Sequence, residues 1–242
     1  MISGGKGKFA KALIQANKKY KIYAPSKNQM NILSQSSISK YMSKKKIDSA
    51  YKKISSWEGY NSTPLLNLNK LNNKLKLGNI FYKDESKRFH LKSFKALGGA
   101  YAVEQVSKGK KNITISSATA GNHGRSVAWG AQRLGLKCKI FISQHVSKAR
   151  EIEIKKFGAD VIRVKGDYAS SLRECKKLTK KHKWKIVQDV SDKNYKLVPK
   201  LTMAGYSIMI KEISKQTAAK IQEQLYQFSG FYLQERTCCS HL

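Results

Sequence analysis

Residues 113–142 read ITISSATAGNHGRSVAWGAQRLGLKCKIFI, and this stretch decides the fold. Its two ends, 113–116 and 138–142, are runs of β-branched and apolar residues that predict strands. Residues 122–134 have the apolar spacing of a helix, and Gly135 stands where a helix ends in a left-handed residue. A strand, a helix and a second strand joined by short loops form a βαβ unit, whose two strands run parallel.

The same pattern recurs on both sides of this stretch. We expect helices at 68–75, 94–107, 148–157 and 169–181, and strands at 79–83, 161–164 and 185–187. Strand starts recur roughly every 24 residues, the length of a βαβ step with short loops. The pattern therefore predicts an α/β fold with an open parallel sheet and helices on both faces. In such sheets ligands bind beyond the carboxyl ends of the strands, where the turn at 119–124 lies.

The net charge of +33 raises the question of a nucleic-acid partner. Only seven of the 48 basic residues are arginine, the usual residue for phosphate and base recognition, and the lysines are spread along the chain. We therefore expect solvated lysine faces and no specific nucleic-acid site. No window of about 18 apolar residues occurs, so we expect no membrane span.

The four cysteines show neither a CxxC pair nor metal-ligand spacing. This spacing predicts no metal site and no disulfide framework, and it favours a reducing compartment, the cytoplasm. Residues 1–47 contain no Asp or Glu, which is a feature of organellar presequences. The stretch also lacks arginine, whereas presequences are rich in it, so we interpret residues 1–55 as a basic preface.

Lys95 lies in the segment SFKALGGA, residues 93–100. An amine attacks an aldehyde only when it is unprotonated, so a lysine that forms a Schiff base needs a desolvated or cation-rich setting. Phe94 before it and the small residues after it predict such a setting. The alternative is a surface lysine at the start of a helix.

The turn Gly121-Asn122-His123-Gly124 suits a planar ligand. Its glycines allow close approach of the backbone, and the helix that follows offers its first amides to an anion. Asn122 can donate a hydrogen bond to a ring oxygen; the alternative is that Asn122 only caps the helix. The charged run KDESKRF, residues 83–89, leaves two interpretations open, a solvated turn or the edge of a cleft.

Together these motifs resemble the fold-type II pyridoxal-phosphate enzymes, whose fold is similar to the β subunit of tryptophan synthase. The runs at 83–89, 94–102 (FKALGGAYA) and 121–129 (GNHGRSVAW) are most similar to diaminopropionate ammonia-lyases. Gln188-Asp189 also matches that family, and the resemblance covers residues from about 60 to 209.

The resemblance implies that pyridoxal 5'-phosphate is the cofactor and that an amino acid is the substrate. It implies that Lys95 bonds to the cofactor and then removes the substrate α-proton, and that Asp189 lies near a substrate amine. The implied cofactor-binding residues are Lys95, Phe94, Gly121, Asn122 and His123. The implied reaction converts 2,3-diaminopropionate to pyruvate and ammonia by α,β-elimination, in a homodimer when full length.

Two departures from the family pattern modify these expectations. Ala120 stands where the family has an aspartate implicated in handling the D-isomer, so we expect a preference for the L-isomer. The family pattern ends after Gln224 without the glycine-rich loop that binds the cofactor phosphate, so we expect an incomplete large domain, apparently truncated at its C-terminal end, and weak or absent activity. The expected parts are 1–55 (preface), 56–110 (start of the large domain), 111–198 (small α/β domain), 199–224 (return to the large domain) and 225–242 (atypical tail).

Two other functional interpretations stay open. One is another fold-type II activity, such as a threonine or serine dehydratase or a synthase that replaces a β-substituent. The other is a non-catalytic basic binding protein.

Overall fold

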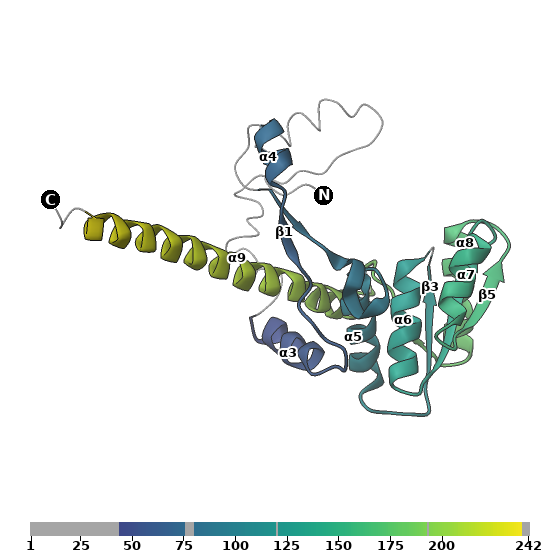
Figure 1. Ribbon diagram of the computed structural model, residues 1–242. Helices are drawn as coiled ribbons and strands as arrows, with labels where there is room; N and C mark the ends of the chain where they lie inside the picture. Colours follow the sequence, from purple (N-terminus) through teal and green to yellow (C-terminus); the bar gives the residue numbers. More distant parts are fainter. Residues whose placement is uncertain (1–43, 76–79, 120, 193, 239–242) are drawn as a thin grey trace. The chain divides into compact units, whose positions relative to one another are not determined.

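The computed structural model describes residues 44–75, 80–119, 121–192 and 194–238 (Figure 1). Ala120 and most of the basic preface therefore lie outside the described residues. The helices are α3 (Lys44–Ser55), α4 (Asn69–Leu75), α5 (Lys95–Ser107), α6 (Asn122–Arg133), α7 (Lys148–Lys155), α8 (Tyr168–Lys181) and α9 (Leu197–Cys238), with a 3-10 helix, η1 (Glu85–His90). The strands are β1 (Leu65–Asn67), β2 (Phe81–Lys83), β3 (Thr114–Ala118), β4 (Lys137–Ser143), β5 (Asp160–Val164) and β6 (Lys185–Ile186).

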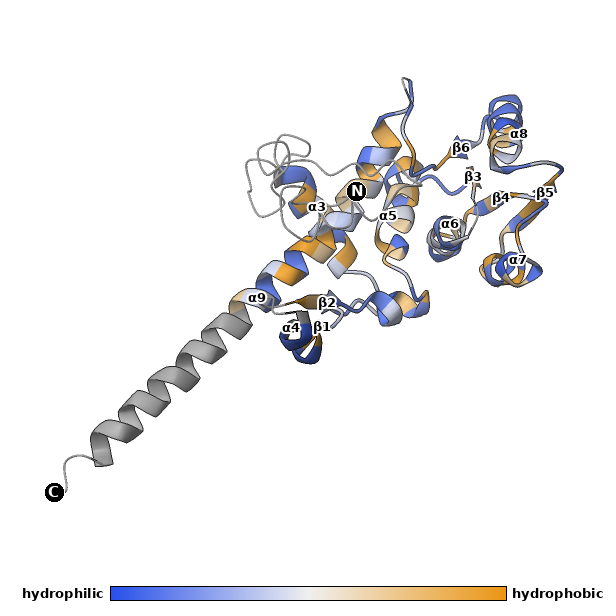
Figure 2. Ribbon diagram, turned by 90° about the horizontal axis from the view of Figure 1, so that it is seen from above, coloured by the Kyte–Doolittle hydropathy of each residue, from blue (hydrophilic) through white to orange (hydrophobic). Residues whose placement is uncertain are grey.

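Strands β3 to β6 form a parallel sheet in the order β5-β4-β3-β6. Successive β4 side chains point to opposite faces, so Ile140 and Ile142 join one apolar cluster and Phe141 joins another. The first cluster is completed from α6 and α7, and the second from α8. Figure 2 shows α6 and α7 on one side of the sheet and α8 on the other. The predicted open parallel sheet with helices on both faces is confirmed.

Helix α5 lies between α6 and α9, and glycines allow the close approach. A Cβ at Gly205 of α9 would overlap the backbone at Leu97 and Gly98 of α5. On the other side, a Cβ at Gly130 of α6 would lie 2.7 Å from the Ala100 Cα. The helix that begins with Lys95 is therefore fixed by backbone contact on two sides, which restricts where that lysine can sit.

Helix α9 runs from Leu197 to Cys238, through both the segment at 199–224 and most of the tail at 225–242. Its third residue, Pro199, is tolerated because the first turn of a helix needs no partner for a backbone N–H. Residues 197–238 contain no strand-turn-helix that could bind a phosphate. The expected domain boundaries stay predictions. Nowhere in the described part of the chain is a helix both long and apolar enough to cross a bilayer.

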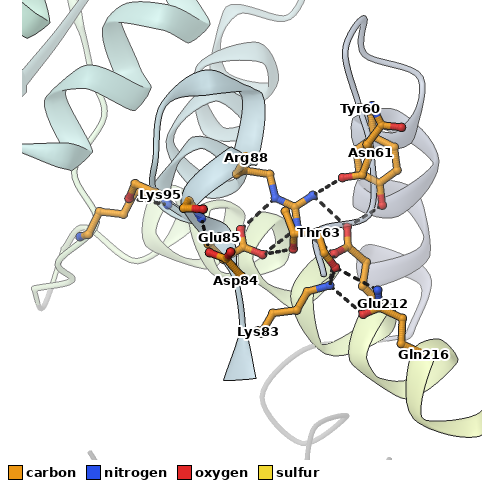
Figure 3. Close-up of polar contacts among 12 residues, drawn as sticks. Tyr60, Asn61, Thr63, Lys83, Asp84, Glu85, Arg88, Lys95, Glu212 and Gln216 are labelled. Atoms are coloured by element: carbon orange, nitrogen blue, oxygen red, sulfur yellow. Dashed lines mark hydrogen bonds and ion pairs between the residues drawn. The ribbon is translucent and has the colours of Figure 1, made fainter. Parts of the chain in front are cut away.

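The charged run at 83–89 is a solvated turn only in part, because Ser86 and Lys87 are exposed but Arg88 is buried. Arg88 is only 1% exposed, and its guanidinium donates to both carboxylate oxygens of Glu85 and of Glu212 at 2.7–2.9 Å. Lys83 pairs with Glu212 at 2.7 Å. Figure 3 shows this buried charge cluster joining the η1 region to α9, with the Lys95 side chain directed away from it. These ion pairs hold the η1 region against α9. None of these residues lines the pocket described next, so we assign them a structural role.

Candidate active site

A pocket of about 330 Å³ lies at the carboxyl edge of the sheet. Its walls come from the last residue of β3 and from residues that follow β3, β4, β5 and β6, together with the first residue of α5. The lining residues are Lys95, Ala118, Thr119, Gly121, Asn122, His123, Arg150, Tyr168 and Asp189. Its volume falls in the lower part of the range of small-molecule sites, about 300–1,000 Å³.

Lys95 begins α5 and points its amine into this pocket. The hydroxyl of Ser126 in α6 donates to the Lys95 carbonyl at 2.5 Å, and a Cβ at Gly99 would overlap that hydroxyl. The Lys95 Nζ lies 2.5 Å from Asp189 Oδ2. The expected desolvated or cation-rich setting is wrong, because the Lys95 side chain is 31% exposed and its nearest charge is a carboxylate. The sequence could not indicate this neighbour, which comes from a distant segment.

The glycine-rich turn is held by one hydroxyl. Thr119 Oγ1 accepts hydrogen bonds from the amides of Gly121 at 3.0 Å and Gly124 at 3.1 Å. A Cβ at Gly124 would overlap the Thr119 side chain, so the turn requires glycine there. Gly121 is the N-cap of α6 and Asn122 is the first helical residue. The alternative in which Asn122 caps the helix is therefore wrong, and its side chain lines the pocket.

His123 and Asp189 form the acid–base part of the pocket. The His123 Nε2 lies 3.0 Å from the carbonyl oxygen of Val187, and its Nδ1 lies 3.7 Å from Asp189 Oδ2. Burial lowers the pKa of His123, and the Asp189 charge only partly opposes this effect. Burial alone would raise the pKa of Asp189, but its electrostatic interaction with His123 and the hydrogen bond from Lys95 lower it overall. Asp189 is therefore a carboxylate at neutral pH.

Five of the six residues proposed from the sequence meet in this pocket: Lys95, Gly121, Asn122, His123 and Asp189. Phe94 does not line it; its ring packs edge-on against Tyr206 of α9, with the centroids 5.0 Å apart. The catalytic and cofactor-binding roles of the six proposed residues stay predictions.

Sequence reasoning did not propose four of the lining residues as site residues: Ala118, Thr119, Arg150 and Tyr168. Arg150 belongs to the first turn of α7, and Tyr168 is the first residue of α8. Both helices follow strands of the parallel sheet, so both residues lie at its carboxyl edge. That position is the signal that could have identified them.

A larger hollow of about 850 Å³ lies between α8 and the segment that follows β6. Its lysines include Lys176, which pairs with Asp192 at 2.9 Å, and it shares only Tyr168 with the smaller pocket. None of the motif residues Lys95, Asn122 and Asp189 lines it. We place the candidate active site in the smaller pocket, because reactive groups converge there.

Two curated proteins are similar to this chain over most of its length. A diaminopropionate ammonia-lyase of Escherichia coli (strain K12) is 35% identical over 176 residues, which cover 65% of this chain and 44% of that protein. A biosynthetic L-threonine dehydratase of Staphylococcus epidermidis is 28% identical over 192 residues, which cover 78% of this chain and 43% of that protein. This chain thus spans less than half the length of each of these curated relatives.

Solved structures and a family model give the same assignment. The crystal structure of the Escherichia coli diaminopropionate ammonia lyase in apo form superposes with a TM-score of 0.71 at 31% identity, covering 79% of this chain and 55% of that chain. A model of the family described as pyridoxal-phosphate dependent enzyme matches residues 57–226, well over half of this chain. The chain therefore belongs to the family of pyridoxal-phosphate-dependent enzymes.

Proposed function

We propose that this chain carries the active-site lysine of a pyridoxal-phosphate-dependent ammonia-lyase that converts 2,3-diaminopropionate to pyruvate and ammonia. One observation carries the proposal: the Lys95 amine shares a single pocket with the Gly121-Asn122 turn and with the Asp189 carboxylate. The similarity to the Escherichia coli ammonia-lyase supports this substrate over others.

The pocket residues fit the chemistry of this cofactor. Lys95 is the only primary amine among them and can bond to an aldehyde. The Asn122 amide is a neutral donor for a ring oxygen, and Gly121 leaves room for a flat ring. When bound, pyridoxal phosphate supplies an electron sink for the electrons left by removal of the α-proton. Among the pocket residues, Arg150 is the one whose positive charge would favour the phosphate.

The side chains divide the work of elimination. The Lys95 amine takes the α-proton of the substrate as a general base. The Asp189 carboxylate attracts the second ammonium group of a diamino acid, because a charge-assisted hydrogen bond favours a cation there. Expulsion of that amino group is the step that separates an ammonia-lyase from a dehydratase. A preference for the L-isomer follows from Ala120, which has no side-chain group able to exchange a proton.

Dehydration of threonine or serine is the second candidate. The identity to the Staphylococcus epidermidis dehydratase supports it, and that match covers more of this chain than the match to the ammonia-lyase. The two candidates differ at Asp189, because a hydroxyl leaving group gains less from a carboxylate than an ammonium does.

The test is ammonia release by the purified chain with pyridoxal phosphate. We expect at most weak release from L-2,3-diaminopropionate, and less from the D-isomer and from L-threonine or L-serine. Lys95→Ala should abolish release, whereas Lys110→Ala, an exposed lysine outside the pocket, should not change it. Faster release from threonine would favour the dehydratase, and equal rates for both lysine variants would refute the assignment of Lys95.

Two further features belong to the same proposal. We propose a cytoplasmic location, supported by the free, buried thiols of Cys138 and Cys175, which suit a reducing compartment. We also propose a homodimer for the full-length enzyme, on the family resemblance alone. Gel filtration with light scattering tests the second point.

A further inference from the structure

The orientation of His123 determines which of its nitrogens carries a proton. The ring is 4% exposed, and Nε2 lies 3.0 Å from the Val187 carbonyl oxygen. A carbonyl oxygen only accepts hydrogen bonds, so Nε2 must be the donor. In the neutral ring Nδ1 is then a bare acceptor, and it has no hydrogen-bond partner among the described residues. Burying an acceptor without a donor costs free energy, so the position of Nδ1 in the pocket requires a physical explanation.

That acceptor faces the ion pair of the pocket. Nδ1 lies 3.7 Å from Asp189 Oδ2, and the same oxygen lies 2.5 Å from the Lys95 Nζ. One carboxylate oxygen therefore stands between a proton donor, the Lys95 ammonium, and a proton acceptor, the His123 Nδ1. A lone pair facing a carboxylate is repulsive, and a proton on Nδ1 would turn that repulsion into attraction.

The proposed function creates a need for such an acceptor. The Lys95 amine can attack an aldehyde or take an α-proton only after it has lost the ammonium proton. On the basis of the proposed function, we propose that His123 Nδ1 receives this proton across the Asp189 oxygen. One N–H bond breaks at Nζ and one forms at Nδ1. Neutral imidazole and ammonium become imidazolium and amine, while Asp189 remains a carboxylate and the charge of the pocket is unchanged.

The other groups around His123 do not compete for this proton. Arg150 from α7 and Tyr168 from α8 line the same pocket. Arg150 stays charged, since a guanidinium is not deprotonated in proteins. Burial raises the pKa of Tyr168, and the charge on Asp189 raises it further, so this phenol stays neutral. Apart from the Asp189 carboxylate itself, His123 is thus the acceptor among the groups lining the pocket.

Nuclear magnetic resonance of the histidines in the cofactor-free chain tests the proposal. The chain has five histidines, and the signal that disappears in His123→Asn belongs to His123. In the wild-type chain we expect the neutral ring to carry its proton on Nε2. In Lys95→Met the pKa of His123 should rise, because Asp189 keeps its charge and loses its cation. In Asp189→Asn the pKa of His123 should fall.

The matched control is Lys139→Met. Lys139 also pairs with an aspartate, Asp160, at 2.6 Å, but it lies outside the pocket, so the His123 titration should not move. A neutral ring protonated on Nδ1 would overturn the proposal, and that measurement needs no variant. An unchanged His123 titration in a folded Lys95→Met chain would overturn it as well.

A second measurement connects the proton transfer to aldehyde chemistry. Borohydride trapping of pyridoxal phosphate on Lys95 should be slower in His123→Asn by about 10²-fold at neutral pH, the usual effect of losing a general base. High pH should restore the rate, because hydroxide then removes the same proton. A uniform slowing without this rescue would indicate a packing defect and overturn the proposal. If no variant is trapped at any pH, the proposed function fails, and the histidine titration still decides this inference.

Discussion

Replacing Arg88 by methionine tests the buried charge cluster and, with it, the tie between η1 and α9. The guanidinium is 1% exposed and donates to both oxygens of Glu85 and of Glu212. Removing one partner of a buried ion pair costs about 3–5 kcal/mol, because the other charge stays buried. Arg88 pairs with two carboxylates, so the free energy of unfolding could fall by twice this amount. We expect it to fall within the range for one pair, because Lys83 still pairs with Glu212.

Urea unfolding followed by circular dichroism measures the loss. Typical domains have a free energy of unfolding of about 5–15 kcal/mol, so the expected loss is a large fraction of the total. With an m-value of about 2 kcal/mol/M, the midpoint should fall by roughly 1.5–2.5 M. Lys139→Met removes an exposed pair and should change the free energy of unfolding by less than about 1 kcal/mol. An Arg88→Met chain within about 1 kcal/mol of wild type would refute the reasoning.

The same cluster sets the sign of a pH effect. Burial alone would raise the pKa of Glu212, but hydrogen bonds from Arg88 and Lys83 lower it below its ordinary value of 4.5. A carboxyl whose pKa is depressed in the folded state stabilises the fold above its unfolded pKa, and this contribution is lost as the pH falls through the folded value. The difference in stability between wild type and Arg88→Met should therefore be largest near neutral pH and shrink below pH 4.5.

Two further variants and one labelling experiment test the packing. Gly205→Ala should separate α9 from α5 and cost about 1–3 kcal/mol in urea unfolding, the range for overpacking; an unchanged midpoint would contradict the close contact of the two helices. Thr119→Val removes the acceptor for two turn amides and should cost about 1–3 kcal/mol; an unchanged midpoint would contradict this role. Burial raises the pKa of Cys138 to about 12 and that of Cys175 to about 11, so both should resist a disulfide reagent at pH 8 until urea is added.

Local sequence signals were enough to predict the helices and strands that build the fold. Glycines at the ends of helices require a left-handed backbone, and Gly109, Gly135 and Gly158 have φ of 76°, 64° and 72°. The spacing of the strands and these helix ends were enough to predict the parallel sheet. The topological rule that ligands bind at the carboxyl ends of the strands then placed the Gly121 turn at the pocket, whereas Asp189 was assigned from the family resemblance.

Contacts between distant segments could not be predicted in this way. The Lys95–Asp189 contact joins residues 94 positions apart, and the Arg88–Glu212 contact joins residues 124 positions apart. Hydrophobic periodicity carries no information on which charges meet across the fold. For the same reason the setting of Lys95 was predicted wrongly, because its near neighbours Phe94 and the small residues of α5 do not supply its closest charge.

The most direct test of the central claim is where pyridoxal phosphate attaches. The chain has 48 − 7 = 41 lysines, so the experiment needs limiting cofactor, borohydride reduction and peptide mass spectrometry. We expect one dominant adduct on Lys95, which disappears in Lys95→Ala and persists in Lys110→Ala. An adduct spread over exposed lysines, with the peptide containing Lys95 no more labelled than the others, would contradict the account.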